Sequence, residues 1–332
     1  MRRARLEALE LSTLRQYEQH LRLHIEPLIG EHPLHRITPP MLEQFKDRLL
    51  QTRSRTMSRK VLTSLKGILK EAVRLGYADH NPAAVVQVRN ARRAGIPPFG
   101  ASVLTESIPS KVELKALLSK SQEVFPLKTS SDRLQSTYCA GTWWHAFIVL
   151  AVFSGMRSSE LRGLTWTNLD FDGRTVKVRQ RADLRSELGP PKSPAANRDI
   201  PMAPLVSKTL AMWRPHCADS RLHLVFPSRN RRIHTNSNIH KMCWGPLQMA
   251  AGLTKLIRRA DGTEILRPRL TFHSLRHAAA SLFIEQGWQP KKVQALMGHS
   301  SIQVTYDIYG KLWDDPRADL AAMARLEQRL LA

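Results

Sequence analysis

The chain has 332 residues, enough for two domains of ordinary size, and 42% of them are hydrophobic. Its mean hydropathy of −0.32 is typical of a folded globular protein and excludes a low-complexity disordered chain. Lys and Arg number 51 against 28 Asp and Glu, which gives a formal net charge of +23. Such an excess of positive charge predicts a polyanionic partner, and nucleic acid is the first candidate.

The cysteines and the apolar runs bear on the cellular compartment. Cys139, Cys217 and Cys243 are widely spaced and form no CxxC pair, which excludes a disulfide scaffold and a cysteine-rich zinc site and fits a reducing cytosol. The basic amino terminus is followed at residues 6–11 by two glutamates rather than by an apolar signal core. The longest apolar run, Ala146–Phe153, has eight residues, too few to span a bilayer. We therefore expect a cytoplasmic protein that is neither secreted nor membrane-bound.

Residues 1–90 have the apolar periodicity of helices. The repeats are Leu14, Tyr17, Leu21, Ile25, then Met41, Leu42, Phe45, Leu49, then Val61, Leu65, Ile68, Leu69, Val73. The helix breakers are Pro27 with Gly30, Pro39-Pro40, and Gly76 with Asn81-Pro82. This pattern predicts short helices joined by tight turns.

The same block carries 16 basic and 9 acidic residues, and four of its cations are clustered. They are Arg53, Arg55, Arg59 and Lys60. Such a cluster can be the solvated face of a helix. We favour a surface that grips DNA phosphates, because clustered cations and helix amino ends both suit phosphate oxygens.

Periodicity stops at residues 91–110, a basic segment rich in Pro and Gly that we interpret as an interdomain linker. A second domain is expected over residues 111–313. It is predicted to begin with a helix through Leu118 and a buried helix near residues 143–153. Alternating strands follow at residues 175–179 and 198–202, and then mostly helices.

Arg157 opens the first of three clusters that carry chemistry. It lies in a glycine turn just before a helix, with Ser158 as the expected N-cap and Glu160 in the first turn. The carboxylate could fix the guanidinium so that its planar fork faces a phosphate. A surface arginine before a helix is also common, so this cluster alone is a weak signal.

The second cluster is His273-Ser-Leu-Arg276-His277. His273 and Arg276 are three residues apart on a helix and so point the same way. A metal site is the alternative, because His273 and His277 have helical ligand spacing. No HExxH glutamate lies between them, and Glu285 is two turns further on, so we expect no metal.

The third cluster follows a helix that is expected to end at Gly298. His299 comes next, and a new helix capped by Ser300 is predicted to carry Tyr306 and Tyr309. A histidine after a helix stop is by itself uninformative.

In this order the three clusters, with a lysine between two strands, resemble the active site of the tyrosine recombinase (phage integrase) family. The segment from Thr13 to Gly30 and on to Pro82 resembles the family's core-binding domain, so the resemblance extends from about Leu11 to Lys311. It implies a mainly α fold with a small antiparallel β-sheet. The implied architecture is a helical, SAM-like core-binding domain over residues 1–90 and an α+β catalytic domain.

The resemblance also implies a reaction and a role for each residue. Such enzymes cleave DNA without metal or ATP, and no GxxxxGK[ST] nucleotide loop is present. The implied roles are Tyr309 as nucleophile, Arg157 and Arg276 as phosphate clamps, His273 for the nucleophile's proton, and His299 as a donor to a non-bridging oxygen. Tyr306 is the competing nucleophile, but Tyr309 has the family's spacing from His299.

The departing 5′-oxygen needs a proton, which a hairpin lysine supplies in the family. Lys192 is the best match, and Lys177 in the preceding strand is the alternative. Arg198, in the returning strand, is expected to touch phosphate or to hold the hairpin.

Assembly and biological role are inferred from the same resemblance. Residues 314–332 are expected to form a helix whose stripe is Leu320, Met323, Leu326 and Leu330, docked on a neighbouring protomer of a homotetramer or packed on its own domain. Expected partners are double-stranded attachment or core sites, and an excisionase or a host DNA-bending protein. The family's additional arm-binding domain is not expected before Leu11 in this sequence, either because it is naturally absent or because the chain is truncated.

The motif from Gly298 to Tyr309 resembles mobile-element integrases more than chromosome-dimer resolvases, so integration or excision of a prophage or genomic island is expected. A catalytically silent DNA-binding protein and a metal-dependent hydrolase are the other hypotheses. The first is disfavoured because every expected site position is filled, and the second because no carboxylate is well placed.

Overall fold

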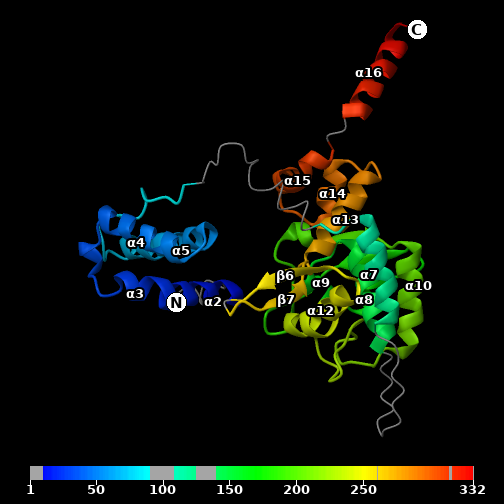
Figure 1. The fold of residues 1–332 in the computed structure, drawn as a ribbon, viewed down its shortest axis with the longest axis horizontal. Helices are drawn as coiled ribbons and strands as arrows, with labels where there is room; N and C mark the ends of the chain where they lie inside the picture. The colour runs from blue at the N-terminus through cyan, green and yellow to red at the C-terminus, as the bar shows by residue number, and fades with distance from the viewer. Residues whose placement is uncertain (1–9, 90–107, 125–139, 260, 314–315, 332) are drawn as a thin grey trace. The chain divides into compact units, whose positions relative to one another are not determined.

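The computed structural model describes residues 10–89, 108–124, 140–259, 261–313 and 316–331. The chain divides into two compact units, residues 1–96 and residues 97–332 (Figure 1). The linker predicted over residues 91–110 lies outside the described residues as far as residue 107, and so does Cys139. Within the described ranges, no helix combines the length and apolar character needed to cross a membrane.

The first unit is helical, as predicted. Its helices are α2 (Leu11–His20), α3 (Glu26–Ile29), α4 (Pro39–Thr52) and α5 (Arg55–Arg74), with a π-helical turn over Leu21–Ile25 and a 3-10 turn over Leu34–Arg36. The apolar repeats close around a common core that includes Ile25, Leu42, Phe45, Leu65 and Leu69. The helical periodicity therefore identified much of the buried face, although Tyr17 and Ile68 of the predicted repeats are exposed.

The break predicted at Pro27 with Gly30 falls at Gly30, and the helix continues through Pro27. The π-helical turn Leu21–Ile25 lies immediately before it, and the helix continues to Ile29. A π turn widens the backbone by one residue, which gives the proline ring more room beside the carbonyls of the preceding turn. The second unit repeats this device, with a π turn at His240–Trp244 before Pro246.

The second unit is built around α8 (Ala140–Ser154). Its residues 143–152 are all buried, and it packs against α7 (Lys111–Glu123), α10 (Pro204–Trp213) and α13 (Ser274–Glu285) (Figure 1). A helix that is apolar on every side belongs at the centre of a domain. The predicted buried helix is therefore the core element of this unit.

Two small antiparallel sheets flank the predicted catalytic segment. Strands β1 (Leu169–Asp170), β2 (Thr175–Val178) and β5 (Arg198–Pro201) form one sheet in that order, with Val176 opposite Ile200. Strands β3 (Arg181–Ala182) and β4 (Leu188–Gly189) form a hairpin inserted between β2 and β5. Both predicted strands are confirmed.

A third β element was not predicted. Strands β6 (Thr254–Arg258) and β7 (Glu264–Pro268) pair along their whole length where only helices were expected. Leu256 and Leu266 on this ribbon are more than half exposed. The ribbon therefore has no buried face, and the alternation of buried apolar and exposed polar residues that predicts a strand does not apply to it.

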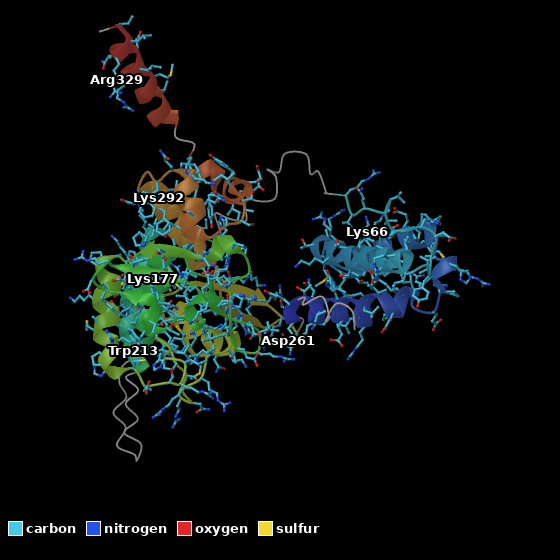
Figure 2. The ribbon with its side chains drawn as sticks, turned by 180° about the vertical axis from the view of Figure 1, so that it is seen from behind. Lys66, Lys177, Trp213, Asp261, Lys292 and Arg329 are labelled. Atoms are coloured by element: carbon cyan, nitrogen blue, oxygen red, sulfur yellow. The ribbon has the colours of Figure 1, made fainter. Side chains whose placement is uncertain are left out.

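The remaining helices include α9 (Ser158–Arg162), α11 (Asn236–Ile239), α12 (Gly245–Ala250), α14 (Pro290–Met297), α15 (Ile302–Tyr309) and α16 (Pro316–Leu331). In α16 the predicted stripe Leu320, Met323, Leu326 and Leu330 is exposed. Figure 2 shows nitrogen-tipped side chains over both units, with Lys66 on the first and Lys177 and Lys292 on the second.

Candidate active site

Arg157 is held by Glu160 at the start of α9. Glu160 Oε2 accepts the backbone N–H of Arg157 at 2.8 Å, and Oε1 accepts Nη1 at 2.9 Å. The predicted pairing of guanidinium and carboxylate is confirmed. The predicted cap is wrong, because Arg157 is the N-cap residue and Ser158 is the first helical residue, with its Oγ donating to Asn236. The carboxylate of Glu160 satisfies the helix amino end in place of a serine hydroxyl.

Arg198 lies on the other side of Glu160 and is buried. Its Nη2 donates to Glu160 Oε2 at 2.8 Å and its Nη1 to Oε1 at 3.1 Å and to the Ala196 carbonyl at 2.9 Å. The donors of Arg198 are directed into the protein, and its contact with DNA stays a prediction. Its position agrees with the alternative role of holding the hairpin.

The charge state of Glu160 follows from these contacts. Burial alone would raise its pKa, but the hydrogen bonds and charges of Arg198 and Arg157 outweigh that effect and lower the pKa to about 2. Glu160 is therefore ionised throughout the neutral range and binds both guanidinium groups as an anion.

The carboxyl end of α14 gathers three arginines from distant parts of the chain. The pairs are Arg198 Nε with the Leu296 carbonyl (2.6 Å), Arg276 Nη2 with the Met297 carbonyl, and Arg157 Nη2 with the Gly298 carbonyl (2.9 Å). The last carbonyls of a helix have no partner within it and carry its negative dipole end, so guanidinium groups are favourable there. Three successive carbonyls thus position the cations of the site.

His273 and Arg276 begin α13, with His273 as its N-cap residue. Arg276 is buried, and its Nη1 donates to the Gly155 carbonyl at 2.6 Å. Burial and the nearby Arg157 and Arg198 lower the pKa of Arg276. Partial desolvation, His277, Arg276 and Arg157 lower the pKa of His273 to about 4, so its ring is neutral at pH 7.

His299 directly follows the αL residue Gly298, whose φ is 63°. Its Nδ1 lies 2.9 Å from Thr305 Oγ1, and both side chains are buried. Burial and the charges of Arg276, Arg157 and Arg198 lower the pKa of His299 to about 3. The helix that follows is capped by Ser301 rather than by the predicted Ser300.

Tyr309 belongs to the cluster and Tyr306 does not. The Tyr309 side chain is 1% exposed, its ring stacks on His299 with centroids 6.3 Å apart, and its hydroxyl lies 2.7 Å from His277 Nδ1. Burial raises the pKa of Tyr309 to about 12, although Arg276 opposes the rise. Tyr306 is 48% exposed and contacts Trp313.

Lys192 is exposed in the segment that leads from β4 into β5. A Cβ on Gly298 would lie 3.2 Å from the Ala196 Cα, so this segment packs against the end of α14. The competing Lys177 lies within β2, where it pairs with Asp170 at 3.5 Å. The segment that carries Lys192 thus reaches the end of α14, and the role of Lys192 as the acid stays a prediction.

The predicted phosphate-gripping cluster of the first unit lies on exposed positions. Arg53 follows the end of α4, and Arg55, Arg59 and Lys60 lie on the first turns of α5. Ser54 caps α5 by accepting the Met57 N–H. DNA contact by these four residues remains a prediction.

The described residues contain no group of three His, Cys, Asp or Glu side chains that could hold a metal ion. The His273 and His277 rings meet edge to face with centroids 4.8 Å apart. The His277 ring hydrogen-bonds to the Tyr309 hydroxyl.

Comparison with known families decides the classification. Residues 120–314 match the phage integrase family, and residues 2–89 match the phage integrase central domain. The chain belongs to the phage integrase family of tyrosine recombinases. The predicted family, fold class and two-part catalytic architecture are thereby confirmed.

The relatives include a transposon transposase and a tyrosine recombinase. The transposase of transposon Tn916 from Enterococcus faecalis is 26% identical over 56% of this chain. That match covers 47% of the transposase, so the chain spans about half the length of this relative. A tyrosine recombinase XerC-like protein of Caldanaerobacter subterraneus is 24% identical over 90% of this chain and 73% of its own length.

Among solved structures, the Tn1549 transposon integrase in complex with transposon right end DNA is similar. The TM-score is 0.70 at 20% identity, with 100% of this chain and 98% of that chain covered. This likeness establishes a common fold for the chain.

Two residues of the site were missed by sequence reasoning. His277 was considered only as a metal ligand, and Thr305 was not considered. His277 contacts Tyr309, 32 residues away in the sequence, and Thr305 contacts His299 across the start of α15. The adjacency of His277 to Arg276 was the one signal that could have indicated it.

Proposed function

We propose that this protein is a site-specific DNA recombinase that cleaves and rejoins DNA through a 3′-phosphotyrosyl intermediate at Tyr309. The observation that carries the proposal is the convergence of Tyr309, His299, Arg276 and Arg157 around the carboxyl end of α14. Family membership and the similarity to DNA-bound integrases support it.

The proposed reaction assigns a task to each side chain. The Tyr309 oxygen attacks the scissile phosphorus and loses its proton to a neighbouring histidine, the P–O5′ bond breaks, and Lys192 protonates the departing oxygen. Arg157 and Arg276 bind the non-bridging oxygens, where negative charge grows. Neutral His299 donates one hydrogen bond to the same oxygens. Ligation reverses these steps.

The names of the relatives support a mobile-element role. Transposases of the transposons Tn916 and Tn1545 and a prophage integrase are among them, so we infer integration or excision of a prophage or genomic island. We further propose a homotetramer on double-stranded core sites, with α16 exchanged between protomers through its exposed stripe. An excisionase or host DNA-bending protein would assist, and the reaction would occur in the bacterial cytoplasm.

Covalent trapping tests this proposal and Tyr309 together. The protein is incubated with host genomic DNA in EDTA and denatured, and adducts are recovered and sequenced. Tyr309→Phe should abolish adducts while DNA binding stays nearly intact, because the hydroxyl is the nucleophile and contributes little to phosphate binding. Tyr306→Phe is the matched control and should form adducts normally.

The outcomes separate the hypotheses. Adducts formed by Tyr309→Phe but lost in Tyr306→Phe would reassign the nucleophile. Binding without adducts from the wild-type protein would favour the catalytically silent DNA-binding hypothesis.

A further inference from the structure

His277 occupies a position that the proposed reaction has left without a role. It lies in α13 beside Arg276, and its Nδ1 is 2.7 Å from the Tyr309 hydroxyl across 32 residues of sequence. The ring centroids of the two residues are 5.7 Å apart. His273 is the residue expected to handle the nucleophile's proton. Its ring contacts the His277 ring, but among the described residues it is His277, not His273, that hydrogen-bonds to Tyr309.

The direction of this hydrogen bond follows from the charge states. Burial and the charge of Arg276 lower the pKa of His277, so its ring is neutral at pH 7. Burial raises the pKa of Tyr309 to about 12, so its hydroxyl keeps its proton in the free protein. The phenolic O–H therefore donates to Nδ1, and the remaining proton of the imidazole is on Nε2.

We propose that His277 is a catalytic residue that accepts the Tyr309 proton during attack on DNA. The inference rests on the proposed recombinase function. As the Oη–P bond forms, the proton passes from Oη to Nδ1. As the P–O5′ bond breaks, Lys192 gives its proton to the leaving oxygen. His277 becomes imidazolium and Lys192 becomes neutral, so protons and charges balance, and both transfers reverse on ligation.

The charged surroundings explain when the acceptor becomes effective. The groups that face His277 are Arg276 and His273 from α13, Tyr309 from α15 and His299 after α14. Lys291 and Lys292 of α14 are exposed, and α8 carries no Asp, Glu, Lys or Arg. Among the residues that the structure describes, no carboxylate acts on His277 to offset an imidazolium. A bound phosphate brings the missing negative charge and raises the proton affinity of His277.

The test uses variants of the full chain and a nicked duplex bearing the site recovered by adduct sequencing. His277→Asn places an amide oxygen near Nδ1, which keeps an acceptor but removes its basicity. Ser281→Ala, one turn further along α13, is the matched control for folding and DNA binding. A 5′-bridging phosphorothiolate removes the demand for Lys192, so the remaining pH dependence reports on the proton acceptor.

With this substrate, the wild-type cleavage rate should fall as the pH is lowered, because protonated His277 can no longer accept the Tyr309 proton. His277→Asn should be slower by roughly 10²- to 10⁴-fold at pH 7.5 and should lose that acid limb. Ser281→Ala and His273→Asn should keep the limb.

Other results would overturn the inference. Wild-type rates with an unchanged pH profile in His277→Asn would leave His277 a positioning residue only. Loss of the limb in His273→Asn would place the acceptor at His273, and this comparison stands even if His277→Asn does not fold. If the wild-type and Ser281→Ala proteins form no adduct, the recombinase function itself fails; if they form adducts and His277→Asn matches them, only this inference fails.

Discussion

At the scale of single residues, Lys192 and the arginines act on different oxygens of the same phosphate. Lys192 is proposed to protonate the bridging 5′-oxygen, whereas Arg157 and Arg276 stabilise charge on the non-bridging oxygens. A substrate modified only at the bridging atom should therefore distinguish them.

Lys192→Ala should fail on ordinary DNA but cleave a 5′-phosphorothiolate at close to the wild-type rate. The sulfur leaves as a thiolate, and a thiol such as that of cysteine has a pKa of about 8.5, so it hardly needs protonation. Arg157→Ala and Arg276→Ala should stay impaired on both substrates. Single-turnover cleavage rates provide the measurement. Normal cleavage of ordinary DNA by Lys192→Ala would move the acid elsewhere, and Lys177→Ala would be tested next.

Thr305 should set the tautomer of His299. For Nε2 to donate to a phosphate oxygen, Nδ1 must accept, so the buried Thr305 hydroxyl must be the donor across the 2.9 Å contact. Thr305→Val, of similar volume, should slow single-turnover cleavage about tenfold, which corresponds to about 1.4 kcal/mol. Thr305→Ser should restore the rate. Equal rates for the valine and serine variants would show that the hydroxyl does not orient His299.

At the scale of elements, Glu160 joins α9 to β5 through Arg157 and Arg198. Its pKa of about 2 in the folded protein lies below that of an unfolded glutamate. A lowered folded-state pKa gives stability that is complete above the unfolded pKa of about 4.3 and is lost as the pH falls toward 2.

Glu160→Gln should therefore remove part of the acid dependence of the free energy of unfolding, of the order of 3 kcal/mol between pH 5 and 2. Denaturant titrations at several pH values provide the measurement. Glu187→Gln, an exposed carboxylate in the β3–β4 turn, is the matched control. Parallel acid profiles for the wild-type and Glu160→Gln proteins would contradict the assignment.

The elements also show what sequence could and could not predict. Periodicity identified the helices and β2 and β5, and motif order identified the family. Helix caps at Ser158 and Ser300 were each misplaced by one residue, because neighbouring local hydrogen bonds, from the Arg157 N–H to Glu160 and from the Gln303 N–H to Ser301, begin the helices instead. The break predicted at Pro27 with Gly30 occurs at Gly30, because a π turn precedes the proline and lets the helix continue through it.

The site was predictable only in part, because some of its contacts join segments that are far apart in the sequence. The residue types at Arg157, His273, Arg276 and Tyr309 follow from their motifs. The burial of Arg198 against Glu160 depends on a contact across 38 residues, and no local pattern encodes it. The hydrogen bond between His277 and Tyr309 depends on how α13 meets α15.

At the scale of the whole molecule, the net charge of +23 should govern how DNA is bound. The logarithm of the association constant should fall with the logarithm of salt at a slope of about −0.9 per neutralised phosphate. Arg59→Ala and Lys60→Ala should each make the slope shallower by about one. Arg74→Ala, at the other end of α5 and paired with Glu71, should not. A flat salt response would argue that the charge serves another purpose.

The carboxyl end of α14 has a consequence for how such a protein can change over time. Three guanidinium groups are oriented by main-chain oxygens, which every amino acid supplies. Leu296 and Met297 are therefore free to drift among apolar residues of similar size without disturbing the phosphate site. Gly298 is not, because its φ is 63° and a Cβ would lie 3.0 Å from Arg198 Nη1. Within this turn, the residue type should therefore be restricted only at position 298, where the side chain must be the hydrogen atom of glycine.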